Sequence, residues 1–541
     1  MSTGDPMRIL ICVKQVRESA DERAAWILNP ADACALEAAL SLRDAQGGEV
    51  TALTMGRPSA EGMLRELLAR GTDRAVLITD PVFAGSDTLV TARVLAAAVR
   101  HIGPFDMIFA GRRAVDGETA ETPARLAALL ELPIVTDVTN LVSSDTCETE
   151  GGDVRHTLRF TSPAVLTFRE GGKPLRPASL AGLRRSRKAA IEVLTNRELG
   201  FPEAQCGLSG SPTRVSRVYD ADPPLRHVQW LQNGSEVLST LRHAMAEPRT
   251  ALQPKAAEGR ICGSVWVLCE RPDADAYALA ARALALTTDG VRILSTAGSS
   301  PEAAADRIRR GQPAAVFCVS TPFLRVFASQ TATLLETGLT ADCTDLQADP
   351  QGLLLQIRPT FGGARMAEIL CPAARPQMAL VRSGVLPASG PLPDVPTEAL
   401  PQQAPDPRIQ CTSESRDEAQ GLLRDAELVI AGGAGIGSAA GFERLGKLAR
   451  ALGGECAASR AAVDAGYAVY PMQIGQTGIT LRPKVYLAFG ISGAIQHVLG
   501  MRDAGTVIAV NTDPKAPVFS HADYGVAGNW ETIVKEMEAL L

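Results

Sequence analysis

The sequence predicts an α/β protein made of three Rossmann-like domains, each built on a parallel sheet. Three observations lead to this fold class. Short apolar runs alternate with helical stretches over roughly the first 200 residues, the alternation restarts near residue 264, and it restarts again near residue 428. Continuous apolar runs are typical of strands that are buried on both faces, as in a parallel sheet covered by helices. A chain of 541 residues is also too long for a single core.

The first domain is expected over residues 1–220. Its strands are predicted at Arg8–Val13, Val50–Met55, Ala75–Ile78 and Met107–Ala110, and its helices at Asp32–Arg43, Ala60–Arg70 and Asp87–Arg100. Parallel strands deliver their carboxyl-end loops to one edge of the sheet, which is where ligands bind.

Two further domains are expected, separated by connecting segments. Residues 221–260 are polar and are predicted to form a connector with one helix, Gly234–Ala246, while the Pro-rich residues 386–420 are predicted to form an inter-domain linker. The second domain, residues 261–385, has strands at Ser264–Cys269, Val291–Ser295 and Ala315–Val319 and a helix at Asp273–Ala285. The third, residues 421–541, has strands at Leu428–Ala431, Val485–Phe489 and Val507–Val510.

The composition excludes several classes of function. A net charge of -6 without a long basic stripe argues against nucleic-acid binding. No apolar run is long enough for stable membrane insertion, and no signal peptide is visible. Eleven scattered cysteines indicate reduced thiols and a cytoplasmic location, and six histidines without metal-type spacing predict no metal site.

Glycine-rich segments are concentrated in the third domain. They lie at residues 431–437, 475–478 and 490–497, and two of them directly follow predicted strands. Glycine permits positive φ and close backbone approach, and the free N–H groups of a following helix favour a phosphate. Two such loops in one domain suit a dinucleotide with a pyrophosphate.

Several of these segments together resemble the FAD domain of the electron-transfer flavoprotein α subunit. They are Ser459-Arg460-Ala461-Ala462-Val463-Asp464-Ala465-Gly466, Gly475-Gln476-Thr477-Gly478, Gly490-Ile491-Ser492-Gly493-Ala494-Ile495-Gln496-His497, Asn511, Asp513, Ala516-Pro517 and Ala522-Asp523-Tyr524-Gly525. Upstream, residues 338–346, Arg358-Pro359 and residues 375–378 resemble the first domain of the same subunit.

The first 220 residues are similar to the β subunit of that family. The similarity is carried by Val13-Lys14-Gln15-Val16, Asn29-Pro30-Ala31-Asp32 and residues 111–120. The resemblance therefore implies both subunits fused in one chain, the β-like part first, and predicts a monomer that acts as a pseudo-heterodimer.

The resemblance also implies a set of FAD contacts. They are Ser459, Arg460, Gly475, Gln476, Thr477, Ser492, Gly493, Ala494, Ile495, Gln496, His497, Asn511 and Asn529. Arg460 would sit near the isoalloxazine and favour an anionic flavin, Thr477 would lie near flavin N5, and His497 would offer a donor or a positive charge to the C2 carbonyl. Two positions depart from the family pattern, because Ala434 replaces a usual Arg and Asn529 a usual Asp.

A second nucleotide site is implied in the β-like part. Its residues are Cys12, Asn29, Asp32, Met55, Asp116, Gly117, Glu118, Thr119 and Thr122. The ligand is AMP or a second FAD, and a purely structural loop without a ligand is the third alternative. Glu121 is expected to add an unfavourable charge, and Pro123 removes an N–H that could hold phosphate.

Leu180 precedes the basic run Arg184–Lys188 and, by the resemblance, stands where the β subunit docks its partners. The alternative to a docking role is that Leu180 is an ordinary half-buried surface leucine. The resemblance implies a soluble electron carrier rather than a substrate-transforming enzyme, with no catalytic residues. It would take electrons from flavoprotein dehydrogenases and pass them to the electron-transfer flavoprotein-quinone oxidoreductase of a membrane. Two alternatives are an electron-bifurcating, NADH-dependent flavoprotein and a nucleotide-binding sensor without redox function.

Overall fold

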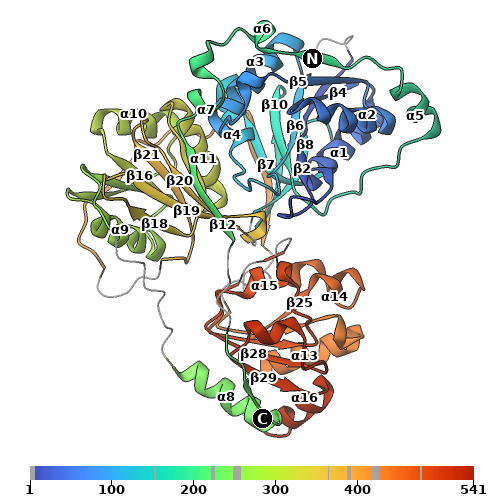
Figure 1. The fold of residues 1–541 in the computed structure, drawn as a ribbon, viewed down its shortest axis with the longest axis vertical. Helices are drawn as coiled ribbons and strands as arrows, with labels where there is room; N and C mark the ends of the chain where they lie inside the picture. Colours follow the sequence, from blue (N-terminus) through green and yellow to red (C-terminus); the bar gives the residue numbers. More distant parts are fainter. Residues whose placement is uncertain are drawn as a thin grey trace.

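The structure, a computed structural model, has three lobes, each with its own parallel sheet (Figure 1). It describes residues 6–151, 154–220, 226–247, 258–363, 365–386, 392–416, 423, 426–475, 478–479 and 481–541. The predicted fold class, three Rossmann-like α/β domains, is confirmed.

The N-terminal lobe contains a ten-stranded sheet in the order β11-β5-β4-β1-β6-β10-β7-β8-β9-β23. The strands from β11 to β7 are parallel, and the last three pair antiparallel. Its strands are β1 (Arg8–Cys12), β4 (Glu49–Met55), β5 (Arg74–Ile78), β6 (Met107–Gly111), β7 (Ile134–Leu141), β8 (Thr146–Gly151), β9 (Val154–Phe160), β10 (Ala164–Phe168) and β11 (Glu192–Leu194). A small hairpin is formed by β2 (Gln15–Arg17) and β3 (Trp26–Leu28). Its helices are α1 (Pro30–Gln46), α2 (Glu61–Arg70), α3 (Thr88–Ile102), α4 (Thr122–Leu130), α5 (Leu180–Ser186), α6 (Asn196–Leu199) and α7 (Gly207–Gly210).

The middle lobe repeats this topology except at one edge, where β22 stands in the place of β5. Its parallel sheet has the order β17-β21-β16-β14-β15-β22, in which β14 takes the place of β1 and β16 the place of β6. The strands are β14 (Val265–Cys269), β15 (Val291–Ser295), β16 (Ala315–Ser320), β17 (Leu339–Cys343), β21 (Gln377–Arg382) and β22 (Thr397–Ala399). The helices are α9 (Ala274–Leu286), α10 (Pro301–Gly311) and α11 (Pro322–Leu334).

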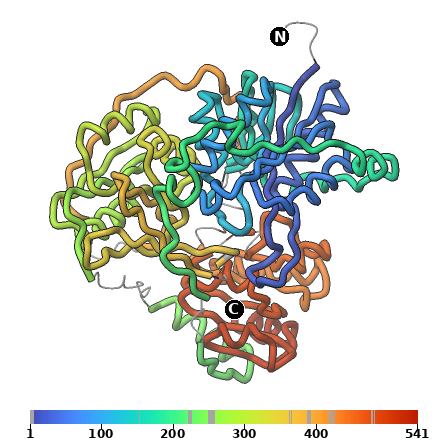
Figure 2. Tube along the Cα trace, turned by 45° about the horizontal axis from the view of Figure 1, so that its top comes forward, coloured from blue at the N-terminus to red at the C-terminus, as the bar shows by residue number. Residues whose placement is uncertain are grey.

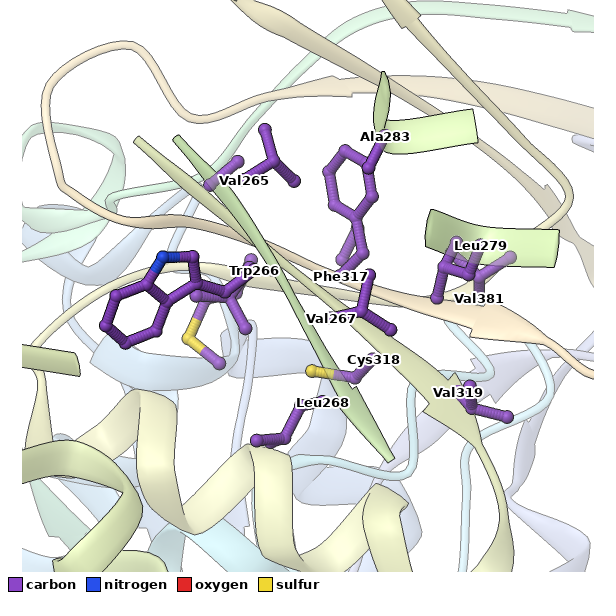
Figure 3. Close-up of a cluster of buried hydrophobic side chains, with 14 of the residues drawn as sticks. Val265, Trp266, Val267, Leu268, Leu279, Ala283, Phe317, Cys318, Val319 and Val381 are labelled. Atoms are coloured by element: carbon purple, nitrogen blue, oxygen red, sulfur yellow. The ribbon is translucent and has the colours of Figure 1, made fainter. Parts of the chain in front are cut away.

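The core of the middle lobe shows why its strands read as continuous apolar runs. Val267 on β14 and Phe317 on β16 lie on the side of the sheet that faces Leu279 of α9, and Trp266 lies on the opposite face (Figure 3). All four side chains are buried. A strand covered on both faces needs apolar residues at every position, not at alternate ones.

A second, antiparallel sheet lies beside this lobe and joins it to the first. Its order is β12-β20-β19-β18, with β12 (Arg214–Asp220), β18 (Asp345–Ala348), β19 (Leu354–Thr360) and β20 (Arg365–Leu370). β12 belongs to the predicted first domain, yet it pairs antiparallel with β20 of the second. The two domains are therefore joined by main-chain hydrogen bonds as well as by side chains.

The C-terminal lobe has the sheet order β13-β29-β28-β27-β24-β25-β26, and all pairs are parallel. Its strands are β24 (Leu428–Gly432), β25 (Glu455–Ser459), β26 (Gln473–Ile474), β27 (Val485–Phe489), β28 (Thr506–Asn511) and β29 (Tyr524–Ala527). Its helices are α13 (Ala439–Ala451), α14 (Arg460–Asp464), α15 (Ile495–Met501) and α16 (Trp530–Glu538). Numbered from β24, the six strands of this segment have the 3-2-1-4-5-6 order of the dinucleotide-binding fold.

The two segments expected to be connectors both contribute secondary structure. Residues 221–260 carry β13 (Gln229–Trp230), which extends the C-terminal sheet next to β29, and α8 (Gly234–Ala246), which packs on α16 (Figure 1). Residues 386–420 carry β22, on the edge of the middle sheet, and β23 (Ile409–Arg416), which pairs with β9 of the N-terminal lobe (Figure 2). Their polar composition is that of edge strands, not of a free linker.

Candidate functional site

The C-terminal lobe brings two glycine-rich loops together where its strand order reverses. The loop after β24 and the loop after β27 lie on neighbouring strands. The N–H of Gly433 donates to the carbonyl of Phe489 at 2.8 Å, and the N–H of Gly435 donates to the carbonyl of Gly490 at 3.2 Å. The reversal of strand order in such a sheet is the place where dinucleotides bind.

Glycine is required at this junction because backbone packs directly on backbone. A Cβ on Gly433 would lie 2.0 Å from the carbonyl oxygen of Gly490, and one on Gly493 would lie 2.1 Å from the backbone nitrogen of Val518. Gly490 and Gly493 also have positive φ angles of 60° and 86°. The three positions therefore exclude any larger residue.

The remaining predicted FAD residues surround this junction. Ser459 ends β25 and caps α14 by accepting from the N–H of Ala462, and Asn511 ends β28 and donates to the carbonyl of Ile491 at 2.9 Å. Asn529 caps α16. Ser492, Ala494, Ile495 and Gln496 are exposed on the loop and first turn that follow β27. Gln476 and Thr477 lie outside the described residues.

Arg460 is placed at the first position of α14, with its side chain 66% exposed. Its Nε lies 3.3 Å from Asp464, one helical turn away. An exposed i,i+4 ion pair contributes about 0.3–0.5 kcal/mol, so a bound anion can draw this guanidinium away at little cost.

His497 is the one predicted FAD contact with a buried ionisable side chain. Its Nε2 lies 2.8 Å from the hydroxyl of Tyr486 on β27, and Nδ1 is buried without a hydrogen-bond partner of normal geometry. Burial lowers the pKa of His497 to about 4, although the backbone of Ile474 opposes this. The imidazole is therefore neutral near pH 7, which favours the expected donor over the expected positive charge.

These features fit an FAD. Gly433, Gly490 and Gly493 form a backbone cradle that holds the two loops together at the point where a pyrophosphate binds in such folds, and exposed polar loop residues line its edge. In the described part of the chain the buried Nδ1 of His497 makes no hydrogen bond of normal geometry, although the backbone of Ile474 lies close to the ring. Ala434 is exposed and uncharged in this cradle, so it supplies no cation of its own.

The N-terminal lobe has its own switch point, between β1 and β6. Cys12 ends β1, Met55 ends β4, and Asp32 lies in the first turn of α1. The Asp32 carboxylate accepts from the backbone N–H of Lys14 at 2.7 Å and of Gly111 at 3.0 Å. Burial raises its pKa to about 7, although these hydrogen bonds oppose the shift. Burial also raises the pKa of Cys12 to about 12, so this thiol is unreactive.

The loop between β6 and α4 is fixed at several points. Asn29 donates to the carbonyl of Arg113 at 2.9 Å, and Asp116 forms an ion pair with Lys14 at 2.7 Å. Gly117 accepts a hydrogen bond from Arg358 of the middle lobe. The middle lobe thus contributes directly to the predicted second nucleotide site.

Glu121 does not present its charge to this loop, contrary to expectation. Its carboxylate is fully buried, accepts from Thr88 at 2.7 Å and pairs with Arg125 at 3.1 Å. Thr122 then begins α4 with Pro123 in its first turn. The Glu121 side chain faces Thr88 of α3 and Arg125 of α4, where it cannot repel a phosphate.

A cavity of about 600 Å³ lies at the junction of the three lobes. Glu118 and Thr119 of the loop line it, together with an arginine cluster formed by Arg112, Arg113, Arg169, Arg325 and Arg382. Arg112 pairs with Asp137 at 2.8 Å, and Arg382 pairs with Asp342. Burial lowers the pKa of Arg112 to about 10, and the neighbouring cations add to this shift. The sequence analysis missed this cluster because its members come from distant strands.

Leu180, the predicted docking residue, begins α5 and is 79% exposed, so the half-buried alternative is wrong. Leu183 on the same short helix is also exposed, and the arginines Arg184 and Arg185 follow it. No helix in the described part of the chain is long and apolar enough to cross a bilayer. Within that part, no group of three His, Cys, Asp or Glu side chains could hold a metal ion.

The fold and the glycine cradle define a dinucleotide-binding α/β protein. Its sequence matches the electron transfer flavoprotein domain at residues 18–199 and 259–406, and the electron transfer flavoprotein FAD-binding domain at residues 422–502. The chain therefore belongs to the electron transfer flavoprotein family, whose members carry electrons on FAD. The first two lobes match one family, in agreement with their shared topology.

Curated relatives include both kinds of subunit. The electron transfer flavoprotein subunit alpha of Thermoanaerobacterium thermosaccharolyticum is 43% identical over 225 residues, which is 40% of this chain and 68% of that protein. Protein FixA of Azorhizobium caulinodans is 40% identical over 238 residues, which is 39% of this chain and 84% of that protein. Protein FixB of the same organism is 41% identical over 231 residues, 42% of this chain and 63% of that protein.

Proposed function

We propose that this chain fuses a β-like and an α-like electron transfer flavoprotein subunit and carries electrons on one FAD bound in the C-terminal lobe. The observation that supports this most is the backbone contact between the loops of Gly433 and Gly490 at the strand-order reversal. The FAD contacts of this proposal are the residues around that junction, with Ser459 at the end of β25, Asn511 at the end of β28 and Asn529 at the start of α16.

Fusion has a physical advantage for a carrier. Tethering two parts raises their effective concentration, so a single chain needs no subunit association. β12 of the β-like part pairs with β20 beside the middle lobe, and α8 of the connector packs on the C-terminal lobe, which supports a permanent pseudo-heterodimer. The donors are flavoprotein dehydrogenases docking at Leu180 and its basic neighbours, and the acceptor is a membrane quinone oxidoreductase.

The loop of Asp116–Thr122 is the proposed site of AMP. A second candidate function, electron bifurcation with a second FAD at this loop, is favoured by one observation, the arginine-lined cavity. Its volume of about 600 Å³ next to Glu118 and Thr119 is larger than AMP phosphate binding alone requires.

Counting nucleotides in the purified full chain tests both candidates. Absorbance gives flavin per chain, and acid release followed by chromatography identifies each nucleotide. One FAD with AMP supports the simple carrier, and two FAD support bifurcation. A colourless protein that takes up no added FAD would overturn both and favour the sensor without redox function.

A further inference from the structure

The cavity at the junction of the three lobes lies at the opposite end of the C-terminal sheet from the glycine cradle. Its lining includes Glu427, which directly precedes β24, and Lys484, which directly precedes β27. Gly433 and Gly490 of the cradle follow the same two strands. A strand of five residues is about 16 Å long. The cavity is therefore separate from the cradle, although it reaches the predicted FAD-binding loop at Gly478.

Two equivalent bulges present aspartates to this cavity. Asp137 lies in β7 and Asp342 in β17, and these strands occupy the same position in the two related sheets. The register of pairing shifts around each aspartate, and both have a φ angle of 61°. A bulge re-aims a side chain, and positive φ at a residue other than glycine is a strained conformation that clusters at functional sites. One carboxylate from each lobe is thus directed to the cavity wall.

Each aspartate holds one member of the arginine cluster. Arg112 Nε lies 2.8 Å from the carboxylate of Asp137, and Arg382 Nε donates to the carboxylate of Asp342 at 2.9 Å. Arg169 pairs with another carboxylate of the lining at 3.6 Å. These three guanidinium groups therefore have counter-ions supplied by the protein itself.

Arg325, on α11 of the middle lobe, has no such counter-ion. In the described part of the chain no carboxylate lies within ion-pair distance of its guanidinium, whose Nη2 donates to Ser320 Oγ at 3.3 Å. Burial lowers the pKa of Arg325, and the cations of Arg113 and Arg382 add to this shift, while the two aspartates oppose it. A lowered pKa means that folding disfavours the charged form, so this charge reduces the stability of the folded protein.

A destabilising charge at the wall of a cavity indicates a ligand. Removing a charge from water without giving it a partner is costly, and a bound anion reverses that cost. A guanidinium presents a planar fork of donors that matches a carboxylate or a phosphate. The volume of about 600 Å³ has room for a ligand with several charged groups.

We propose that this cavity binds a small multivalent oxyanion, a molecule that carries phosphate or carboxylate groups, and that Arg325 is its principal contact. The anion supplies the counter-charge that the protein does not give to Arg325. Because the lining comes from all three lobes, including Arg482 of the C-terminal lobe, the anion also links them. Glu118, Glu170 and Glu427 line the cavity too and weaken its attraction for anions, so the affinity depends on direct contacts with the guanidinium groups.

Titration calorimetry of the full chain with inorganic pyrophosphate and with citrate tests the proposal, and the two probes distinguish a phosphate ligand from a carboxylate ligand. At least one probe should bind with a 1:1 stoichiometry. Its affinity should fall roughly 10- to 100-fold in Arg325→Met, because a hydrogen bond from a charged group is lost. Arg310→Met, at an exposed position on α10 of the same lobe, is the control and should bind as the parent does. Absence of binding, or equal binding by Arg325→Met, would overturn the proposal.

Urea denaturation gives an independent readout. Arg325→Met should raise the urea midpoint of the ligand-free protein, because an unpaired charge is replaced by an apolar side chain of similar length. The same variant should lose the increase in midpoint that the bound probe gives to the parent. A lower midpoint in the ligand-free variant would show that Arg325 serves the fold and not a ligand.

Flavin content keeps this site distinct from the proposed function. Binding of a probe by a protein that takes up no FAD would support the anion site although the electron carrier fails. A protein that holds FAD and binds neither probe would refute the anion site alone. A second FAD per chain that blocks both probes would assign the cavity to that flavin and would also overturn the proposal.

Discussion

Arg358, on β19 of the middle lobe, donates a hydrogen bond to the backbone carbonyl of Gly117 in the loop of the N-terminal lobe. Its side chain is buried, and among the described residues its Nε and one terminal nitrogen have no hydrogen-bond partner. The predicted second nucleotide site is therefore completed by a residue from the other half of the chain.

Replacing Arg358 with Met should weaken AMP binding without a large loss of stability. A hydrogen bond from a charged group is worth about 1.5–3 kcal/mol, so release of the loop should reduce affinity by roughly 10- to 100-fold. The substitution loses the hydrogen bond to Gly117, but it also removes two buried donors that have no partner among the described residues, so the free energy of unfolding should change little. Titration calorimetry with AMP measures the affinity, and urea denaturation measures the stability. An unaltered affinity for AMP would show that Arg358 does not contribute to the nucleotide site.

The glycine cradle predicts a contrast between two alanine variants. A Cβ on Gly433 would meet the Gly490 carbonyl at 2.0 Å, whereas one on Gly437 meets no atom within 4 Å. Gly433→Ala should push the two loops apart and release FAD. Gly437→Ala has only the cost of positive φ, about 1 kcal/mol, and should retain FAD. Flavin content of the purified variants checks this, and equal retention by both would argue against the cradle.

The buried pair Glu121–Arg125 predicts a strongly asymmetric mutational response. Arg125→Met leaves a buried carboxylate without its cation and should destabilise the fold by about 3–5 kcal/mol. The double variant Glu121→Gln with Arg125→Met should recover most of that loss. Urea denaturation of both variants gives the difference. Equal destabilisation of single and double variants would show that packing, not charge, dominates this contact.

Asp32 predicts a pH dependence opposite to that of a salt-bridged acid. Its pKa is raised by burial from 3.8 to about 7, so the folded state holds the proton more tightly than the unfolded state. Its contribution to stability is complete below about pH 4 and is lost as the pH rises through 7. The free energy of unfolding of the parent, measured relative to that of Asp32→Asn, should therefore decrease by roughly a few kcal/mol between pH 4 and pH 8. A difference that stays constant with pH would contradict the assignment.

Replacing Leu180 is expected to affect only the interaction with partner proteins. Its side chain is 79% exposed at the start of α5, so Leu180→Ala should leave stability and flavin content unchanged. Electron transfer from a dehydrogenase should slow, because an exposed apolar anchor is lost. Stopped-flow reduction measures the rate. Val142→Ala, at a position that is 56% exposed in the turn between β7 and β8, is the control. An unchanged rate for Leu180→Ala would remove it from the docking surface.

The strands and helices with strong local patterns were predicted well from the sequence. The predictions for Val291–Ser295, Val485–Phe489 and Gly234–Ala246 coincide with β15, β27 and α8, because burial on one or both faces imposes a clear apolar pattern. The β23 strand was missed because its residues are exposed and a Pro-rich segment precedes it. Its partner, β9, lies far away in sequence, and no local signal reveals such a pairing.

The candidate site was predictable to the extent that it rests on backbone geometry. Glycine motifs identify positions where a Cβ would collide, so the loops of Gly433 and Gly490 could be found from sequence alone. Arg325 and Arg358 could not, since the cavity and the loop that they contact are assembled only in the folded chain. An arginine within an apolar strand that precedes a glycine-rich loop is the signal that could have indicated Arg358.

α8 has a consequence for how the protein is made. Its buried Val237 and Leu238 complete a core whose six main strands, β24 to β29, begin at Leu428 and are synthesised much later. Until translation of the C-terminal lobe is complete, the apolar face of this helix stays exposed to solvent, and such exposed surface is prone to aggregation. Expression of the last lobe alone would lack the same piece, so adding residues 226–247 in trans should improve its yield.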